Sequence, residues 1–155
     1  MATEWVMLAY RLPREPSTPR IALWRRLKKL GVAQVVDGLV ALPGDRRTRE
    51  QLEWAAQEVT QAGGFASLWT AKAASAGDER ALRERMTKAV SDDYELVIAA
   101  ANAADSKDPA ARRRALKQLR RTQNAIELRD YFPTPKRAEA RDAVERLAQT
   151  VEVAQ

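Results

Sequence analysis

The order of strand and helix signals in residues 4–71 constrains the fold more than any other feature of this sequence. Short apolar runs of strand-favouring residues alternate there with stretches of helical spacing. Strands are expected at 5–12, 32–36, 39–42 and 65–71, and helices at 19–30 and 48–62. Prolines close the first run and glycines follow both helical stretches, so each element has a marked end. The segment therefore reads as β-α-β-β-α-β.

The connections within this segment predict an antiparallel sheet. Asp37-Gly38 separates the second and third runs, and this dipeptide is typical of a type I′ hairpin because both central residues accept positive φ. Each helical crossover returns the chain to the same sheet with right-handed connectivity. We therefore expect an α+β fold in which a four-stranded antiparallel sheet carries two helices on one face, the ferredoxin-like βαββαβ architecture.

The second half of the chain reads as helical. After residue 71 the β-branched and aromatic runs disappear, and Ala, Arg, Glu and Leu dominate. Helices are expected at about 75–104, at 109–128 after the Asp108-Pro109 start signal, and at 135–151. We predict a ferredoxin-like unit at 1–72 and a helical C-terminal extension of two to three helices at 73–155, packed on the first as one structural unit.

The residue types that are missing exclude several classes of function. The 155 residues include no Cys and no His, which excludes disulfides, thiolate zinc sites and imidazole bases or metal ligands. No Gly-rich phosphate loop and no carboxylate pair suited to acid–base work is visible. We expect a protein that is not an enzyme, with no catalytic residues, no metal and no cofactor.

The same composition indicates a location. The absence of Cys fits the reducing cytoplasm. No apolar run at the N-terminus is long enough for a signal peptide or a membrane span. A cytoplasmic protein with no membrane partner is therefore expected.

The basic charge is concentrated in two predicted helices. The net charge is only +6, but residues 21–29 hold four Lys or Arg and no acid, and residues 109–129 hold seven against the single Glu127. Such local excess suits an anionic partner such as DNA. The candidate DNA-binding residues are Arg25, Arg26, Lys29, Arg112, Arg113, Lys117, Arg120 and Arg121. The alternative is an ordinary solvated helix face, because Lys and Arg are good helix formers.

Two other groups of residues invite a functional interpretation. Trp side chains could stack on bases, but core or dimer packing explains most of them, and Trp24 falls on the apolar face of the first helix with Leu23 and Leu27. Asp92-Asp93-Tyr94-Glu95 could be taken for a metal cluster, but neighbours in sequence point to different sides of a helix. A solvated acidic turn of helix is expected there.

Several short motifs together resemble a known family. In chain order they are Trp5-Val-Met-Leu-Ala-Tyr-Arg-Leu-Pro13, Glu15-Pro16-Ser17, Trp24-Arg-Arg-Leu-Lys-Lys-Leu-Gly31, Leu42-Pro43, Arg49-Glu-Gln-Leu52, Gly63-Gly64 and Arg129-Asp-Tyr-Phe132. Their order and spacing over nearly the whole chain are similar to those of the N-terminal domain of ChrB, a family of chromate-resistance regulatory proteins. The resemblance implies a chromate-responsive regulator of a chromate-efflux operon, with its N-terminal part associated with DNA. Typical members continue into a second domain, so a stand-alone version or a fragment is expected here.

A more distant resemblance runs through the sheet unit. It is similar to the ferredoxin-like fold of CRISPR-associated (Cas) nucleases, which is also used in the phenylacetate regulator PaaX. Metal-dependent nucleases of this shape need a carboxylate at the end of strand one, where this chain has Tyr10-Arg11. Because arginine cannot ligate a divalent metal, nuclease activity is not expected.

The chromate connection raises a second candidate site. Arg11, Arg14 and Arg20 surround the turn between the first strand and the first helix, beside the backbone N–H groups of residues 17–20. Arginine forks and helix N-termini bind small anions well, so chromate or a similar oxyanion is a candidate ligand. The alternative is that Ser17 and Thr18 merely cap the helix.

The leading interpretation is a non-enzymatic, DNA-binding transcriptional regulator associated with chromate resistance. It is expected to form a homodimer, because sheets of this kind leave an edge strand that a symmetric partner can cover. The alternative is an oxyanion-sensing or protein-interaction accessory module that does not bind DNA.

Overall fold

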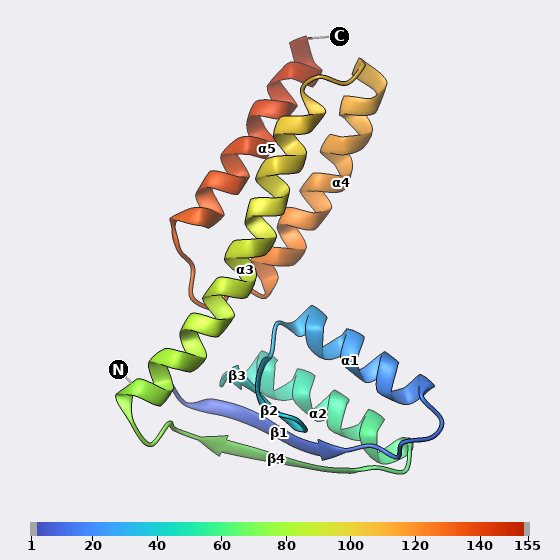
Figure 1. The fold of residues 1–155 in the computed structure, drawn as a ribbon, viewed down its shortest axis with the longest axis vertical. Coiled ribbons are helices and arrows are strands. Elements are labelled where there is room, and N and C mark those ends of the chain that lie inside the picture. Colours follow the sequence, from blue (N-terminus) through green and yellow to red (C-terminus); the bar gives the residue numbers. More distant parts are fainter. Residues whose placement is uncertain (1–2, 154–155) are drawn as a thin grey trace. The chain divides into compact units, whose positions relative to one another are not determined.

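The first half of the chain folds as a four-stranded antiparallel sheet with two helices on one face (Figure 1). The computed structural model describes residues 3–153. Its first elements are β1 (Trp5–Arg11), α1 (Thr18–Leu30), β2 (Ala33–Val36), β3 (Leu39–Pro43), α2 (Arg46–Gln61) and β4 (Phe65–Ala71). The strand order is β2-β3-β1-β4, with antiparallel pairing throughout. This order confirms the predicted α+β class and its ferredoxin-like start.

Alternation along the strands gives the sheet an apolar face that packs on α1 and α2. Val6 and Leu8 of β1 lie opposite Leu42 and Val40 of β3, and all four are at most 2% exposed. The helices supply the matching buried side chains Leu23, Leu27, Leu52, Ala55 and Val59. Because burying one such aliphatic side chain contributes about 1.5–3 kcal/mol, this layer is the main attachment of the helices to the sheet.

α2 begins two residues before its predicted start because of a cap that apolar periodicity does not reveal. The Asp45 carboxylate accepts a hydrogen bond from the Thr48 N–H at 2.8 Å, and the Thr48 hydroxyl accepts one from the Asp45 N–H at 3.0 Å. The hydroxyl also donates to the Pro43 carbonyl at 2.6 Å. This capping box joins the end of β3 to the start of α2, and a cap of this kind contributes about 1 kcal/mol.

The turn between β2 and β3 differs from the predicted type I′ hairpin. Gly38 has a φ of +78°, but no non-glycine residue in the described chain has a positive φ, so Asp37 does not fit that turn type. The register also shifts between Gln34 and Val36. The prediction of a type I′ turn is therefore wrong. Gly38 lies against β1 instead. Its carbonyl accepts a hydrogen bond from the Tyr10 N–H at 2.8 Å. A Cβ atom at this position would lie only 2.7 Å from the backbone carbonyl oxygen of Tyr10.

The chain comprises two compact units, Met1–Met86 and Thr87–Gln155. The first turns of α3 (Ala76–Ala104) therefore group with the sheet, although the sequence predicts an end of the sheet unit at residue 72. Glu79 connects them, because it accepts from the Trp5 indole at 2.9 Å and pairs with Arg83 at 3.1 Å. Burial alone would raise the pKa of the Glu79 carboxyl, but the hydrogen bonds from Trp5 and Thr3 and the charge of Arg83 hold it below its ordinary value.

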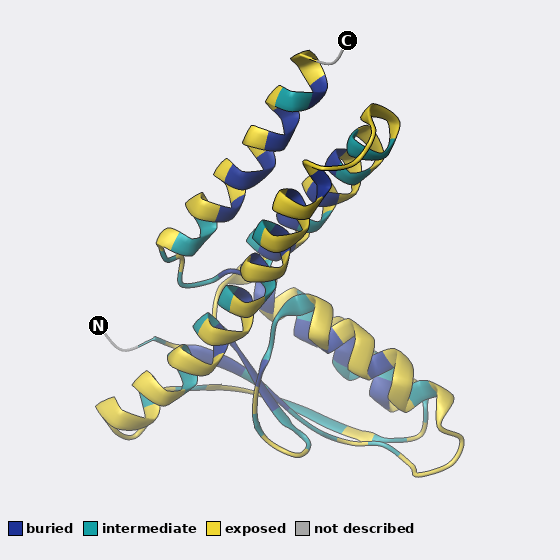
Figure 2. Cartoon of the chain, turned by 45° about the horizontal axis from the view of Figure 1, so that its top comes forward, coloured by how far each residue is buried: buried dark blue, intermediate teal, exposed yellow. Residues whose placement is uncertain are grey.

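The second unit consists of three helices, namely the rest of α3, α4 (Pro109–Leu128) and α5 (Pro135–Val153). Buried residues recur every three or four positions along one side of each helix, where the ribbon is dark blue in Figure 2. In α3 they are Val90, Tyr94, Val97, Ala101 and Ala104. This spacing is the one expected of helices that bury a common seam. The predicted helical C-terminal half is confirmed, and within residues 3–153 no helix has the length and apolar character that crossing a membrane requires.

Candidate nucleic-acid interface

One side of α4 carries a stripe of positive charge. Arg113, Lys117, Arg120 and Arg121 are spaced i, i+4, i+7 and i+8, which places them along one face of the helix. All four are exposed, and none forms an ion pair with another residue of the described range 3–153. We refer to these four residues as the basic stripe. From its first residue to its last, the stripe extends about 12 Å along the helix axis.

The basic stripe lines a groove of about 450 Å³. Leu116 and Asn124 of α4 and Val151 of α5 complete its lining. Leu116 and Val151 also belong to the buried core of the helical unit, so the groove is built on packed side chains. Four cations around a partly apolar groove suit a ligand that carries negative charges at intervals along its length.

At the start of α4, an N-cap stabilises the helix, and Arg112 makes contacts that keep it out of the basic stripe. The Asp108 carboxylate accepts from the Ala111 N–H at 2.9 Å, a hydrogen bond that lowers the pKa of Asp108. Arg112 is half-buried, and its guanidinium donates to the Lys107 carbonyl at 3.0 Å. It lines a different cavity, with Asp105 and Arg146. The structure thus brings together four of the five predicted contacts on this helix.

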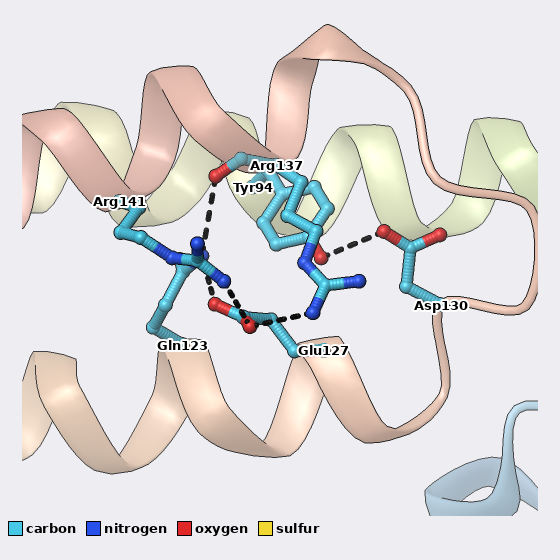
Figure 3. Close-up of polar contacts among 6 residues, drawn as sticks. All are labelled: Tyr94, Gln123, Glu127, Asp130, Arg137 and Arg141. Atoms are coloured by element: carbon cyan, nitrogen blue, oxygen red, sulfur yellow. Dashed lines mark hydrogen bonds and ion pairs between the residues drawn. The ribbon is translucent and has the colours of Figure 1, made fainter.

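A polar network holds the C-terminal half of α4 against α5 (Figure 3). The Glu127 carboxylate accepts hydrogen bonds from Arg141 at 2.6 Å, from Arg137 at 2.9 Å and from Gln123 at 2.9 Å. Burial alone would raise the pKa of Glu127, but these hydrogen bonds hold it below its ordinary value. Since two guanidinium groups of α5 converge on one carboxylate of α4, the network fixes how the two helices face each other.

The motif at residues 129–132 ties the turn between α4 and α5 to α3. The Tyr94 hydroxyl donates to the Asp130 carboxylate at 2.8 Å, and these residues are only 1% and 8% exposed (Figure 3). Burial, together with the neighbouring Asp130 carboxylate, raises the pKa of Tyr94 well above its ordinary value. Arg129 pairs with Asp93 at 2.9 Å. The motif itself was visible in the sequence, but its partners on α3 were not.

Residues 92–95 point in different directions, as predicted. Asp92 pairs with Lys88 at 2.9 Å, Asp93 with Arg129, and Glu95 with Lys136. Tyr94 is buried, so the expectation of a fully solvated turn is wrong at that position. Among residues 3–153, no three carboxylates gather where they could hold a metal ion.

In the sheet unit, a pocket of about 890 Å³ opens at the turn between β1 and α1. Arg11 at the end of β1 and Arg20 and Arg25 on α1 line it, together with Trp24 and Tyr10. The pocket brings together two of the three predicted anion-binding residues and one predicted DNA-binding residue, whereas Arg14 is not among its lining residues. Ser17 occupies the N-cap position of α1 but makes no capping hydrogen bond with its side chain.

The remaining cations of α1 do not form a comparable stripe. The Arg26 guanidinium pairs with Glu58 of α2 at 2.9 Å. Lys28 lies over the ring of Trp24 at 4.8 Å, and Lys29 is exposed. Trp24 is 59% exposed, so its predicted place on the buried face of α1 is wrong. The buried face of α1 is a narrow strip through Leu23 and Leu27, and Trp24 lies outside it.

Comparison with known proteins shows the family. Residues 20–107, more than half of the chain, match the family model described as "Protein ChrB, N-terminal". The chain belongs to the ChrB N-terminal family. Protein ChrB of Cupriavidus metallidurans is 32% identical over 143 residues, which cover 89% of this chain and 43% of that protein. The chain therefore spans less than half the length of this ChrB relative. No solved structure matches the chain significantly.

The two ChrB matches differ in how they cover the basic stripe. The family model ends at residue 107, just before α4 begins at Pro109. The alignment with the Cupriavidus protein leaves only about a tenth of this chain uncovered, so it includes α4. Similarity to ChrB thus extends over both compact units.

Proposed function

We propose that this chain is the DNA-binding part of a non-enzymatic transcriptional regulator of chromate resistance. Its membership of the ChrB family supports the association with chromate-resistance regulation. The observation that carries DNA binding is the basic stripe of α4, four exposed cations with no acidic partner in the described chain.

The dimensions of the stripe suit the sugar-phosphate backbone. Duplex DNA presents about one negative charge per 1.7 Å of its axis, so a stripe of about 12 Å meets enough phosphates to pair all four cations. Each arginine fork can donate two parallel hydrogen bonds to one phosphate. Contacts of this kind release counterions, and the affinity should therefore fall steeply as the salt concentration rises.

The test is a mobility-shift titration against the DNA upstream of the protein's own operon, at low and moderate salt, with and without chromate. The stripe variant is R113A/K117A/R120A/R121A. A control variant, R46A/R47A/K72A/R80A, removes the same charge from exposed positions of the sheet unit. We expect the stripe variant to lose binding and the control variant to keep it. No binding by the unmodified chain at low salt would overturn the proposal, and equal losses in both variants would overturn the assignment to α4.

The pocket in the sheet unit favours a second candidate, an anion-sensing accessory module that does not bind DNA. Three arginines, Arg11, Arg20 and Arg25, line this one pocket against a single acid, Asp37. Its volume of about 890 Å³ is typical of pockets for organic ligands and much larger than a tetrahedral oxyanion needs. Calorimetric titration with chromate tests this candidate. Saturable binding that R11A/R20A abolishes, in a chain that does not shift DNA, would favour it over the regulator.

A further inference from the structure

The sheet has two edges, and only one of them is protected against pairing with another strand. β2 has four residues and a register shift, and its Gln34 carbonyl accepts a hydrogen bond from Arg85. β4 has seven residues, and it pairs with β1 at all seven positions with no shift. Its sequence, Phe-Ala-Ser-Leu-Trp-Thr-Ala, includes no charge and no proline. Since edge strands usually carry such features to prevent association, β4 is an open edge.

β4 also presents two large aromatic rings to solvent. Phe65 and Trp69 are 68% and 60% exposed, and alternation along the strand places them on the same face as Ser67. The Trp69 indole N–H donates to the Ser67 hydroxyl at 2.9 Å, so the indole is held over the middle of the strand. Within residues 3–153, no strand pairs with the outer edge of β4. Because burying the two exposed rings and pairing the open backbone groups is more favourable than leaving them in water, a partner strand is expected on this edge.

We propose that β4 pairs antiparallel with β4 of a second copy of this chain, around a two-fold axis at Ser67. In this register Ser67 lies opposite Ser67 of the partner subunit, and Phe65 lies opposite Trp69 of the partner subunit. The second aromatic pair follows from the symmetry, because an isologous contact occurs twice. The two sheets become one, and the open backbone groups of both strands are paired.

The sequence pattern of β4 points to a second copy and not to an unrelated strand. The two rings stand two residues before and two residues after Ser67, so the strand is complementary to itself in the antiparallel direction. Cross-strand aromatic pairs are among the favourable ones in antiparallel sheets. An axis at Leu68 would place Trp69 opposite Ser67 of the partner subunit and would lose both pairs. The inference does not depend on the basic stripe, and its test uses no DNA.

Disulfide cross-linking tests the register, since the chain has no cysteine of its own. Directly opposite residues have Cα atoms about 4.5–5.5 Å apart, which a disulfide can span. We expect S67C to form a covalent dimer under mild oxidation at least about tenfold faster than T70C. T70C is the matched control, because Thr70 is exposed on the same strand but lies about 20 Å from its own copy in this register. Faster cross-linking of L68C than of S67C would overturn the register.

Sedimentation of cysteine-free variants tests the surface itself. W69S removes one ring from each subunit and therefore both aromatic pairs, so the dimer dissociation constant should rise at least about tenfold. W54S is the control, because Trp54 is 56% exposed on α2 and is not part of the β4 edge. Circular dichroism establishes that both variants are folded. A monomeric unmodified chain, or equal effects of W54S and W69S, would overturn the proposal.

Discussion

Replacing Tyr94 with Phe tests whether the polar network, and not apolar packing alone, stabilises the helical unit. The change removes one oxygen atom and keeps the ring in its buried place. It breaks the 2.8 Å hydrogen bond from the Tyr94 hydroxyl to the Asp130 carboxylate. Because Asp130 is itself buried, water cannot easily replace the lost donor. The cost should therefore exceed that of losing an exposed hydrogen bond.

The expected loss of stability in Y94F follows from the charge on the acceptor, the Asp130 carboxylate. A hydrogen bond to a charged group contributes about 1.5–3 kcal/mol, so we expect Y94F to lower the free energy of unfolding by about 2 kcal/mol. For a unit of this size that corresponds to a fall in melting temperature of roughly 10 °C. Thermal and urea unfolding followed by far-UV circular dichroism measure both quantities. Y10F is the control, since Tyr10 is only half-buried and its change should cost less than about 0.5 kcal/mol.

The pH dependence provides an independent check. The folded pKa of Tyr94 lies above the ordinary value of 10, so the folded chain holds its proton at pH values where the unfolded chain loses it. The stability that neutral Tyr94 contributes is fully present below about pH 10, and it falls by up to about 1.4 kcal/mol per pH unit as the pH rises toward the folded pKa. Y94F should lose less stability between pH 10 and 12. A loss under about 0.5 kcal/mol at pH 7, or an unchanged alkaline profile, would refute this reasoning.

Two further substitutions test other parts of the structure. Glu127→Gln should flatten the acid limb of the stability profile, because the lowered pKa of Glu127 gives stability that is present above its ordinary value of 4.5 and lost as the pH falls through the folded value. Urea midpoints between pH 3 and 6 measure this, and a limb as steep as in the unmodified chain would contradict it. Gly64→Ala should destabilise the sheet unit by about 1–3 kcal/mol, since its Cβ would lie 2.3 Å from the Arg11 carbonyl oxygen. Tryptophan emission reports on that unit, which holds all four Trp residues, and Gly77→Ala, with no atom nearer than 3.8 Å, is the control that should cost nothing.

The parts of the fold with strong local signals could be predicted from the sequence. The bounds of β4 and α4 match their predictions. β4 is a run of strand-favouring residues that directly follows Gly63-Gly64. Before α4, Asp108-Pro109 combines an N-cap with a proline at the first helical position. The strand order then follows from the order of the elements, because the crossovers and the short connection allow few ways to close the sheet.

What the sequence could not show depends on contacts between distant residues. Tyr94 and Asp130 meet across 36 positions, and no local pattern connects a tyrosine in an acidic run with an aspartate in a turn. Trp24 is exposed because only a narrow strip of α1, through Leu23 and Leu27, is buried. The apolar spacing in the sequence did not show how narrow that strip is. Which of the predicted cations lie together also could not be read from the sequence. Arg113 joins the basic stripe while its neighbour Arg112 turns to the Lys107 carbonyl.

The central claim is that the basic stripe of α4 contacts DNA phosphates, and the salt dependence of binding tests it most directly. Each phosphate contact contributes about 0.9 to the slope of log affinity against log salt concentration. Fluorescence anisotropy over a salt series should show the slope of R113A/K117A/R120A/R121A reduced by about 3.6 relative to the unmodified chain, whereas the control variant R46A/R47A/K72A/R80A should stay within about 0.5 of it. A stripe variant with an undiminished slope would contradict the claim.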